Sequence, residues 1–169
     1  PVFVEHDTRA MALGEQAFGL AKGKNNVLCL NIGSGIGLGM ILNGKLYVGH
    51  SGFSGELGHI QVDPEGELCY CGKIGCLETV ASGTTMIKNA KEKLEAGATS
   101  LLRTLVDNDL DKISSELILE AAQRGDQFAI GLLSNIGEYL GKGIAILIHI
   151  FNPELIIIGG ELTKADNYL

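Results

Sequence analysis

The 169-residue sequence has no tryptophan, and only 5% of its residues are aromatic. Basic residues are also few, with 13 lysines and arginines against 20 acidic residues and a net charge of −7 at pH 7. This balance argues against binding of a nucleic-acid backbone by this part of the chain itself. Long apolar runs are missing too. The longest, residues 143–151, is about half of the ~20 residues needed to cross a bilayer, so we expect no membrane span.

Cysteine is the residue type whose placement is most informative. Cys69, Cys71 and Cys76 fall within eight residues, and His59 stands ten positions before the first of them. Three thiolates and one imidazole make a closed tetrahedral ligand set for Zn²⁺. Neighbouring glycines allow the tight turns that let the thiolates converge. We therefore predict a structural zinc site at His59, Cys69, Cys71 and Cys76.

Two other interpretations of these cysteines stay open. A disulfide is the first, although Cys69 and Cys71 are too close in sequence to pair easily. Buried free thiols are the second, although three thiols in a polar, glycine-rich loop are unusual in a core. The fourth cysteine, Cys29, lies in a predicted strand and is expected to be a core thiol. Thiols used mainly for metal are typical of a reducing compartment, so we expect a cytoplasmic protein.

The first residues predict a strand followed by a helix. Residues 2–4 are apolar and are expected to form a buried strand, which suggests that structure upstream of Pro1 is missing. Residues 8–19 show helical spacing of apolar residues. The members of this spacing are Ala10, Leu13, Ala17 and Leu20. Asp7 stands at the end of the strand, where it is either the N-cap of the helix or a reacting group; the residues alone favour the cap.

A glycine-rich stretch follows the predicted strand 27–32. Glycines stand at 33, 35, 37 and 39, an arrangement that lets backbone N–H groups approach a phosphate. The stretch is not a Walker loop, and a strand rather than a helix follows it. A structural hairpin and a phosphate site therefore both remain open. Asn43-Gly44, between residues 40–42 and 45–48, predicts a two-residue hairpin turn.

The rest of the chain is predicted to be mainly helical. A loop rich in glycine and serine leads to Glu56, which is close enough to His59 for both to face one pocket. Helices are predicted over residues 78–94 (with a break at 82–83), from Ser114 to about 124, and to about 151, where Asn152-Pro153 stops the last one. A buried strand, 155–158, ends in Gly159-Gly160, which either lets a planar ring or a phosphate lie against the backbone or is simply a turn.

The resulting β-β-β-α-β order predicts an α/β fold in which helices cover a mixed sheet. The sequence also resembles the ROK family of sugar kinases and sugar-responsive repressors. The stretch GHIQVDPEGELCYCGKIGCLE matches the family pattern of ExGH followed by CxCGxxGCxE, and EHD, NIGSGIGLG, SGFSGELGH and FNPELIIIGG are supporting matches. The resemblance implies an actin-like ATPase (ribonuclease H-like) lobe. Residues 1–24 would end a small lobe and include the connecting helix, and residues 25–169 would form the large lobe with a zinc loop at 59–78.

The resemblance also implies a ligand set. His59 and the three cysteines would hold zinc, while His6, Asp7, Glu56, His59 and Glu78 would face a hexose or N-acetylhexosamine. In kinase members, the residue matching Asp7 is the general base. Gly33, Ser34, Gly35 and Gly37 would cradle the phosphates of ATP with its Mg²⁺, and Gly159 and Gly160 would lie near the adenosine. Family members are usually dimers or tetramers, so we expect a homo-oligomer.

Two departures favour the repressor branch, which includes N-acetylglucosamine and xylose repressors. His6 stands where kinase members usually carry Asn, and HDTRAMALGE, IQVDP and CYCG are closer to repressors. The Asp-x-Gly-x-Thr phosphate turn of the family is absent from this chain and, like any DNA-binding domain, would lie upstream of Pro1. We therefore expect the sugar-sensing part of a transcriptional regulator of carbohydrate metabolism. The alternative is an ATP-dependent sugar kinase.

Overall fold

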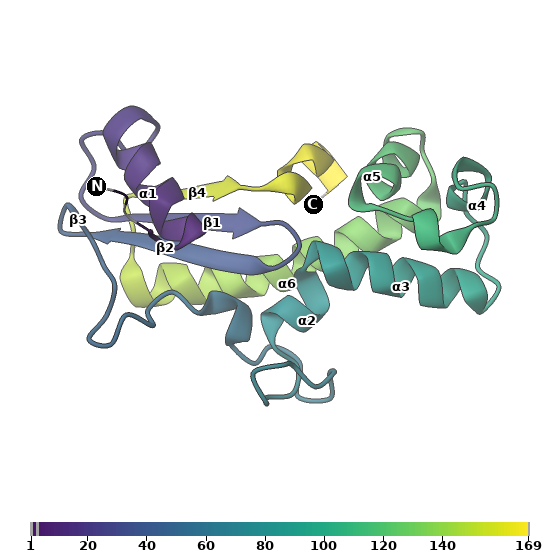
Figure 1. The fold of residues 1–169 in the computed structure, drawn as a ribbon, viewed down its shortest axis with the longest axis horizontal. Coiled ribbons are helices and arrows are strands. Elements are labelled where there is room, and N and C mark those ends of the chain that lie inside the picture. The colour runs from purple at the N-terminus through teal and green to yellow at the C-terminus, as the bar shows by residue number, and fades with distance from the viewer. Residues whose placement is uncertain (1, 3, 169) are drawn as a thin grey trace.

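The computed structural model describes residue 2 and residues 4–168 of the chain. Its centre is a mixed sheet with strand order β3-β2-β1-β4 (Figure 1). The long antiparallel hairpin pairs β1 (Val27–Ile32) with β2 (Ile36–Leu42), and β4 (Leu155–Gly159) lies parallel to β1 on its other side. The predicted β-β-β-α-β order along the chain and the mixed sheet are confirmed.

The turn between β2 and β3 (Lys45–Leu46) has the predicted geometry. Asn43 and Gly44 both have positive φ, 53° and 75°, as a type I′ turn requires. The two-residue turn therefore sets the register, in which Leu42 pairs with Lys45. The third strand is shorter than predicted, since it ends at Leu46 rather than near residue 48.

Helix α1 (Asp7–Phe18) covers one face of the sheet at glycine positions of β2. A Cβ on Gly39 would lie 2.8 Å from the Cβ of Ala12, so the helix backbone lies nearly against the strand. The buried residues of the helix are accordingly the small Thr8 and Ala12. The helix predicted at residues 8–19 is confirmed, although the apolar residues that indicated it do not form its buried face, since Leu13 is 41% and Leu20 70% accessible. Because α1 packs so closely on the glycines of β2, only small side chains fit between the helix and the strand.

The strand predicted at residues 2–4 is not found in its described part. Val2 and Val4 belong to no strand and are 94% and 96% exposed, and Phe3 lies outside the described residues. Neither Val2 nor Val4 pairs with a strand among the described residues. Apolar composition alone predicted burial, whereas burial requires a partner surface.

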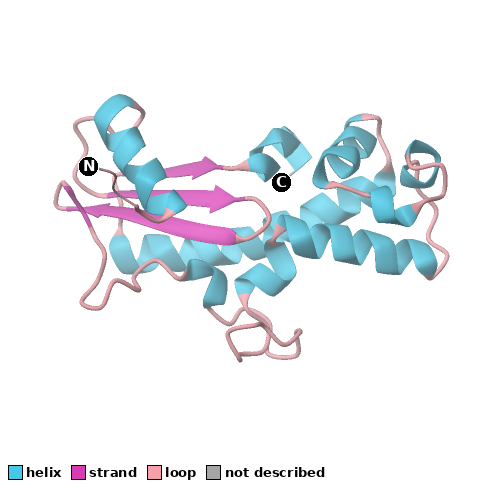
Figure 2. Cartoon of the chain, in the orientation of Figure 1, coloured by secondary structure: helices cyan, strands magenta, loops and turns pink. Residues whose placement is uncertain are grey.

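On the opposite side of the sheet from α1 runs α6 (Gln127–Phe151), and the other helices extend from it beyond the end of the strands, as Figure 2 shows. These other helices are α2 (Leu77–Ala81), α3 (Gly83–Glu95), α4 (Leu102–Leu105) and α5 (Ser115–Gln123). One 3₁₀ helix, Leu57–His59, precedes α2, a second, Leu110–Lys112, lies between α4 and α5, and a third, Glu161–Tyr168, follows β4. The loop of residues 59–78, called the metal-ligand loop below, leads into α2. The main core joins these helices to Leu28, Leu30 and Leu38 of the sheet. A Cβ on Gly143 of α6 would lie 2.8 Å from Leu77, so this glycine permits the predicted close packing.

The helix boundaries follow local capping chemistry. Ser82 breaks the predicted helix into α2 and α3, because its hydroxyl accepts a hydrogen bond from the backbone N–H of Thr85 at 3.2 Å. Ser114 caps α5 in the same way, as predicted, through the N–H of Leu117. Asp126 caps α6 through the N–H of Ala129. None of the helices in the described part has the length and hydropathy that a membrane span requires.

Strand β4 differs from the prediction of full burial. Ile157 is buried, but Ile158 is 44% exposed. Within the described residues the strand is at the edge of the sheet, paired only with β1. An apolar run predicts a buried strand equally well whether one or both of its edges are covered.

Candidate functional site

The four metal-ligand candidates meet at one point. Each of the four residues, His59, Cys69, Cys71 and Cys76, offers one ligand atom, a ring nitrogen or an Sγ. These four atoms all lie within 4.8 Å of one another. The Sγ atoms of Cys71 and Cys76 are 3.6 Å apart, and the Sγ of Cys69 is 3.5 Å from Nδ1 of His59. A tetrahedron with metal–sulfur bonds of about 2.3 Å has edges of about 3.8 Å. The geometry therefore fits one tetrahedral metal ion, and the residues can hold it with four protein ligands.

The loop that carries the ligands is folded tightly by its backbone. Cys69 N donates to the carbonyl of Lys73 at 2.7 Å, and Gly72 N donates back to the carbonyl of Cys69. Gly75 has φ of 67°, and a side chain there would run into the carbonyl of Asp63. The predicted need for glycine in this loop is confirmed at Gly75, where both the conformation and the close approach exclude other residues.

The thiols of the cluster differ in their environments. Burial raises the pKa of the Cys76 thiol to about 12, whereas a backbone hydrogen bond from Lys73 lowers the pKa of the Cys71 thiol. A metal ion must therefore displace a firmly held proton from Cys76, which makes metal binding compete with protons.

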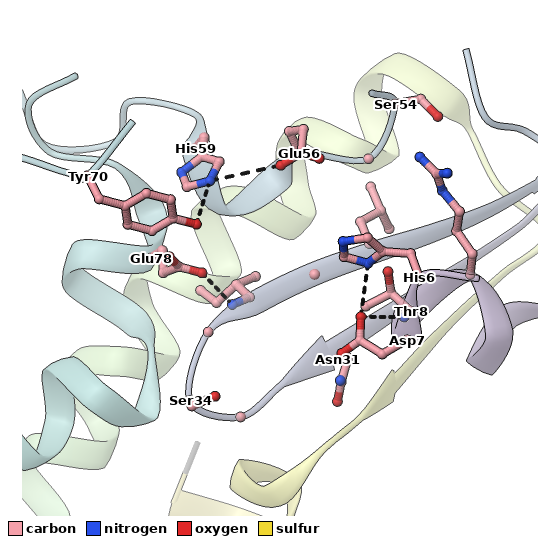
Figure 3. Close-up of a pocket in the computed structure, with 17 residues that line it drawn as sticks. His6, Asp7, Thr8, Asn31, Ser34, Ser54, Glu56, His59, Tyr70 and Glu78 are labelled. Atoms are coloured by element: carbon pink, nitrogen blue, oxygen red, sulfur yellow. Dashed lines mark hydrogen bonds and ion pairs between the residues drawn. The ribbon is translucent and has the colours of Figure 1, made fainter. Parts of the chain in front are cut away.

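A polar cavity of about 290 Å³ lies beside this cluster. Figure 3 shows that side chains from three separate segments face it: Asp7 from the start of α1, Glu56 and His59 from the 3₁₀ helix, and Glu78 from α2. With His6, three carboxylates and two imidazoles thus surround a space large enough for a small polar molecule. The structure brings together the residues that the sequence pattern assigned to a sugar.

His59 belongs to both the metal cluster and the cavity. Its Nδ1 faces the cysteines, while its Nε2 is directed toward the cavity, 3.9 Å from Oε2 of Glu56. A metal ion on Nδ1 leaves Nε2 protonated, so that Nε2–H is a hydrogen-bond donor. The metal cluster can therefore orient a donor in the cavity without itself entering it.

Glu78 is held in place by the hairpin between β1 and β2. Its Oε2 accepts a hydrogen bond from the backbone N–H of Ile36 at 2.9 Å. A Cβ on Gly35 would lie 2.6 Å from the same oxygen, so glycine at this position lets the carboxylate reach the backbone. This contact explains Gly35 without a bound phosphate.

The other glycines of the hairpin divide into two groups. Gly37 and Gly39 lie beneath α1, where a side chain would collide with Thr8 or Ala12. Gly33 has no heavy atom within 4 Å of its Cβ position, so packing does not explain it. Gly33, Ser34, Gly35 and Gly37 all line the cavity. Packing thus accounts for three of the four glycines, and a role in phosphate binding stays a prediction.

The hairpin tip is tied to the first turn of α3. The N–H of Gly83 donates to the carbonyl of Gly33 at 2.7 Å, and the Thr84 hydroxyl donates to the carbonyl of Ser34 at 2.8 Å. These bonds fix the tip relative to α2, which carries Glu78. The hairpin tip bonds to the start of α3, and the metal-ligand loop leads into α2, which directly precedes α3. The hairpin and the loop are therefore connected through these two consecutive helices.

Gly159 and Gly160 end β4 and are not among the residues that line the cavity. Gly160 has φ of 99°, and its Cβ position lies 2.6 Å from Oδ1 of Asn31. The paired glycines therefore permit a turn close to the end of β1. Their predicted place near an adenosine stays a prediction.

The start of α1 departs from the predicted cap. His6, not Asp7, occupies the N-cap position, and its side chain makes no capping hydrogen bond. Asp7 is the first helical residue; its Oδ1 accepts from the N–H of Thr8 at 2.7 Å and lies 3.0 Å from Nδ1 of His6. The Asp7 side chain is 70% exposed and faces the cavity. The structure thus leaves this carboxylate accessible to a ligand.

Tyr70 and Arg9 are among the cavity residues that sequence reasoning missed. Tyr70 stands between two metal-ligand candidates, and its hydroxyl lies 3.0 Å from Nε2 of His59. Arg9 donates to the carbonyl of Gly52 and so ties α1 to the loop that leads to Glu56. Tyr70 could have been predicted from the sequence. It stands between Cys69 and Cys71, and if these two bind one metal ion together with His59, the tyrosine must lie close to that histidine. Arg9 could not have been predicted in this way, since its partner is 43 residues away.

The mixed sheet, its flanking helices and the cavity beside a His/Cys cluster define one lobe of an actin-like ATPase fold. The chain belongs to the ROK family, whose family model matches residues 1–169.

Three relatives illustrate the range of this family. The chain is 40% identical to the DNA-binding transcriptional dual regulator NagC of Escherichia coli, over 99% of this chain and 40% of that protein. It is 44% identical to a solved ROK family transcriptional regulator, a homologue of the Escherichia coli Mlc protein, with a TM-score of 0.90 over 100% of this chain and 41% of that one. It is 38% identical to a ROK family glucokinase from Streptomyces griseus, solved in complex with glucose and AMPPNP. The TM-score of that match is 0.89, over 98% of this chain and 54% of that one. The chain thus spans about half or less of the length of these relatives.

Proposed function

We propose that this chain is the sugar-binding part of a ROK-family transcriptional regulator of carbohydrate metabolism. The observation that carries the proposal is the convergence of Asp7, Glu56, His59 and Glu78 on one cavity. Carboxylates suit a hexose or N-acetylhexosamine because each accepts hydrogen bonds from vicinal hydroxyls. The protonated Nε2 of His59 adds a donor. Such a mixed set matches the alternating donors and acceptors of a sugar ring.

We further propose that the His/Cys cluster holds Zn²⁺ in a structural role. Thiolate and imidazole ligands favour zinc, and four protein ligands leave no position open for water. When bound, the ion supplies folding energy and holds the loop of residues 59–78 in place. His59 and Glu78, at the two ends of that loop, are thereby positioned for the sugar. The reduced thiols that this site needs agree with a cytoplasmic location.

The regulator is favoured over the kinase by the start of α1. His6 lines the cavity and contacts Asp7, where a kinase member would usually carry an asparagine. Sugar binding would shift the position of this lobe relative to the rest of the protein. DNA would be contacted only by a domain outside this chain, since the acidic charge of the chain disfavours DNA. We expect the intact protein to be a homo-oligomer.

The second candidate function is an ATP-dependent hexose or hexosamine kinase. The exposed carboxylate of Asp7, which shares the cavity with the glycine-rich hairpin, favours it. Asp7 would take the proton from the sugar hydroxyl that attacks the γ-phosphoryl group of ATP. Gly33, Ser34, Gly35 and Gly37 would lie against the phosphates and their Mg²⁺, with Gly159 and Gly160 near the adenosine.

Isothermal titration of the intact protein with glucose and N-acetylglucosamine tests sugar binding. Glu78→Gln should weaken binding at least tenfold and leave the zinc content unchanged, because it removes the charge of the carboxylate but no metal ligand. Glu138→Gln, on the surface of α6, is the matched control and should bind as the wild type does. Equal affinity in wild type and Glu78→Gln would remove Glu78 from the sugar site.

An assay of sugar-dependent ATP turnover separates the two functions. The regulator predicts no turnover beyond background, together with operator DNA binding that changes when sugar is added. The kinase predicts turnover that Asp7→Asn abolishes while sugar still binds. Turnover that persists in Asp7→Asn would exclude Asp7 as the base.

A further inference from the structure

Tyr70 reaches back from the metal-ligand loop over His59. Its two neighbours in the chain, Cys69 and Cys71, both belong to the cluster, so the backbone on each side is held. The tyrosine ring stands edge-on to the imidazole, with centroids 5.0 Å apart and planes at 86°. Its hydroxyl lies 3.0 Å from Nε2 of His59, as the dashed line in Figure 3 shows. The hydroxyl therefore occupies the hydrogen-bonding position of the His59 nitrogen that is directed toward the cavity.

His59 has one proton to offer at this position. With a metal ion on Nδ1, Nε2 carries the hydrogen and is a donor only. Tyr70 accepts at 3.0 Å, whereas Oε2 of Glu56 at 3.9 Å is too distant for a hydrogen bond. A sugar oxygen that accepts from His59 must therefore displace the Tyr70 hydroxyl.

The tyrosine side chain lies mostly outside the core. Its residue is 83% exposed, its ring and the imidazole of His59 are nearly perpendicular, and the carboxylate of Glu78 lies near its hydroxyl. Rotation of the side chain away from the cavity therefore uncovers little core surface. By contrast, Glu78 is anchored to the backbone of β2 and cannot move aside so easily.

We propose that Tyr70 is the gate of the sugar site: its hydroxyl holds the place of a sugar hydroxyl on His59 and turns out when sugar binds. The proposal rests on the proposed sugar-binding function of the cavity. The gate lowers affinity, because a sugar whose hydroxyl accepts from His59 must first break the Tyr70–His59 hydrogen bond. It also lowers discrimination, because a sugar that lacks the competing hydroxyl leaves that bond intact.

The test is Tyr70→Phe in the intact, metal-loaded protein, titrated with glucose, N-acetylglucosamine and the monodeoxy derivatives of the sugar that binds. Phenylalanine keeps the ring and removes the hydroxyl. The affinity for the parent sugar should rise about two- to tenfold, the net effect of one hydrogen bond. One deoxy derivative should lose several-fold more affinity in the variant than in the wild type. Tyr139→Phe, on α6 and outside the cavity, should change neither quantity.

Three results would overturn the gate. Unchanged affinity would show that the hydroxyl does not compete with sugar, and weaker affinity would show that it binds the sugar directly. Loss of bound metal in Tyr70→Phe would assign the residue to the metal-ligand loop instead. If neither wild type nor variant bound any sugar, the proposed function would fail together with the gate. Equal, measurable binding by both proteins would refute the gate alone.

Discussion

Gly39→Ala is a test of how the sheet positions the candidate site. Gly39 does not line the cavity, but its new methyl group would lie 2.8 Å from the Cβ of Ala12 and even closer to the carbonyl of Thr8. Carbon atoms in contact normally stay about 3.5–4.0 Å apart, so α1 must move away by about 1 Å. Neither collision partner can rotate aside, because one is a backbone atom and the other a Cβ. Overpacking of this kind costs about 1–3 kcal/mol of stability.

The same movement displaces the ligand groups that α1 carries. Asp7 is the first residue of the helix, so its carboxylate would shift with it by about 1 Å. Misplacement of that size can cost up to about 100-fold in function, and we expect sugar affinity to fall at least tenfold. Urea denaturation measures the loss of stability, and isothermal titration measures the loss of sugar affinity.

Gly14→Ala is the matched control for this prediction. Gly14 lies in the same helix, and no heavy atom lies within 4 Å of its Cβ position. Alanine there should raise stability by up to about 1 kcal/mol, because glycine is a poor residue in a helix interior. If Gly39→Ala were as stable as the wild type and bound sugar equally well, close packing of α1 on β2 would not be what positions Asp7.

Two further predictions concern the metal cluster and the sheet edge. Cys71→Ser should release the metal and lower the melting temperature, whereas Cys29→Ala, in the core away from the cluster, should keep one equivalent of metal; equal metal content in the two variants would refute the ligand set. Oε2 of Glu154 accepts the N–H groups of Asn25 and Asn26 at 2.7 Å each, and these bonds lower the pKa of the carboxyl. The ionised Glu154 carboxylate should therefore stabilise the fold above its ordinary pKa of 4.5, and this stabilisation should be lost as the pH falls below that value. Glu154→Gln should flatten the dependence of the unfolding free energy on pH in acid. An unchanged dependence would contradict a stabilising role of the Glu154 hydrogen bonds.

The elements that the sequence predicted correctly depend on local chemistry. The turn at Asn43-Gly44 requires positive φ at two successive residues, and few sequences provide it. The caps at Ser82 and Ser114 act within three residues. The His/Cys residues that meet in one cluster lie within 18 residues of chain, 59–76, so that short spacing already limits their geometry. In each case the interacting groups are neighbours in the chain.

The wrong predictions involve surfaces that come from distant segments. The spacing of Leu13 and Leu20 predicted a helix but does not mark its buried face: α1 contacts the sheet through Thr8 and Ala12, because Gly37 and Gly39 of β2 allow only a close, small-residue contact. Full burial of β4 was wrong at Ile158, since burial depends on whether another strand covers that edge. The cap assigned to Asp7 was wrong by one residue because a helix start is set by backbone geometry.

The sequence by itself determined the order of strands and helices, the hairpin turn and the His/Cys ligand set, since each depends on residue type and short spacing. Only the tertiary structure decided that Glu78 is anchored on the backbone of Ile36, that Tyr70 covers His59, and that Gly35 serves the approach of a carboxylate. These contacts depend on the mutual placement of β2, α2 and the metal-ligand loop. That placement results from packing of the whole core, which no local pattern encodes.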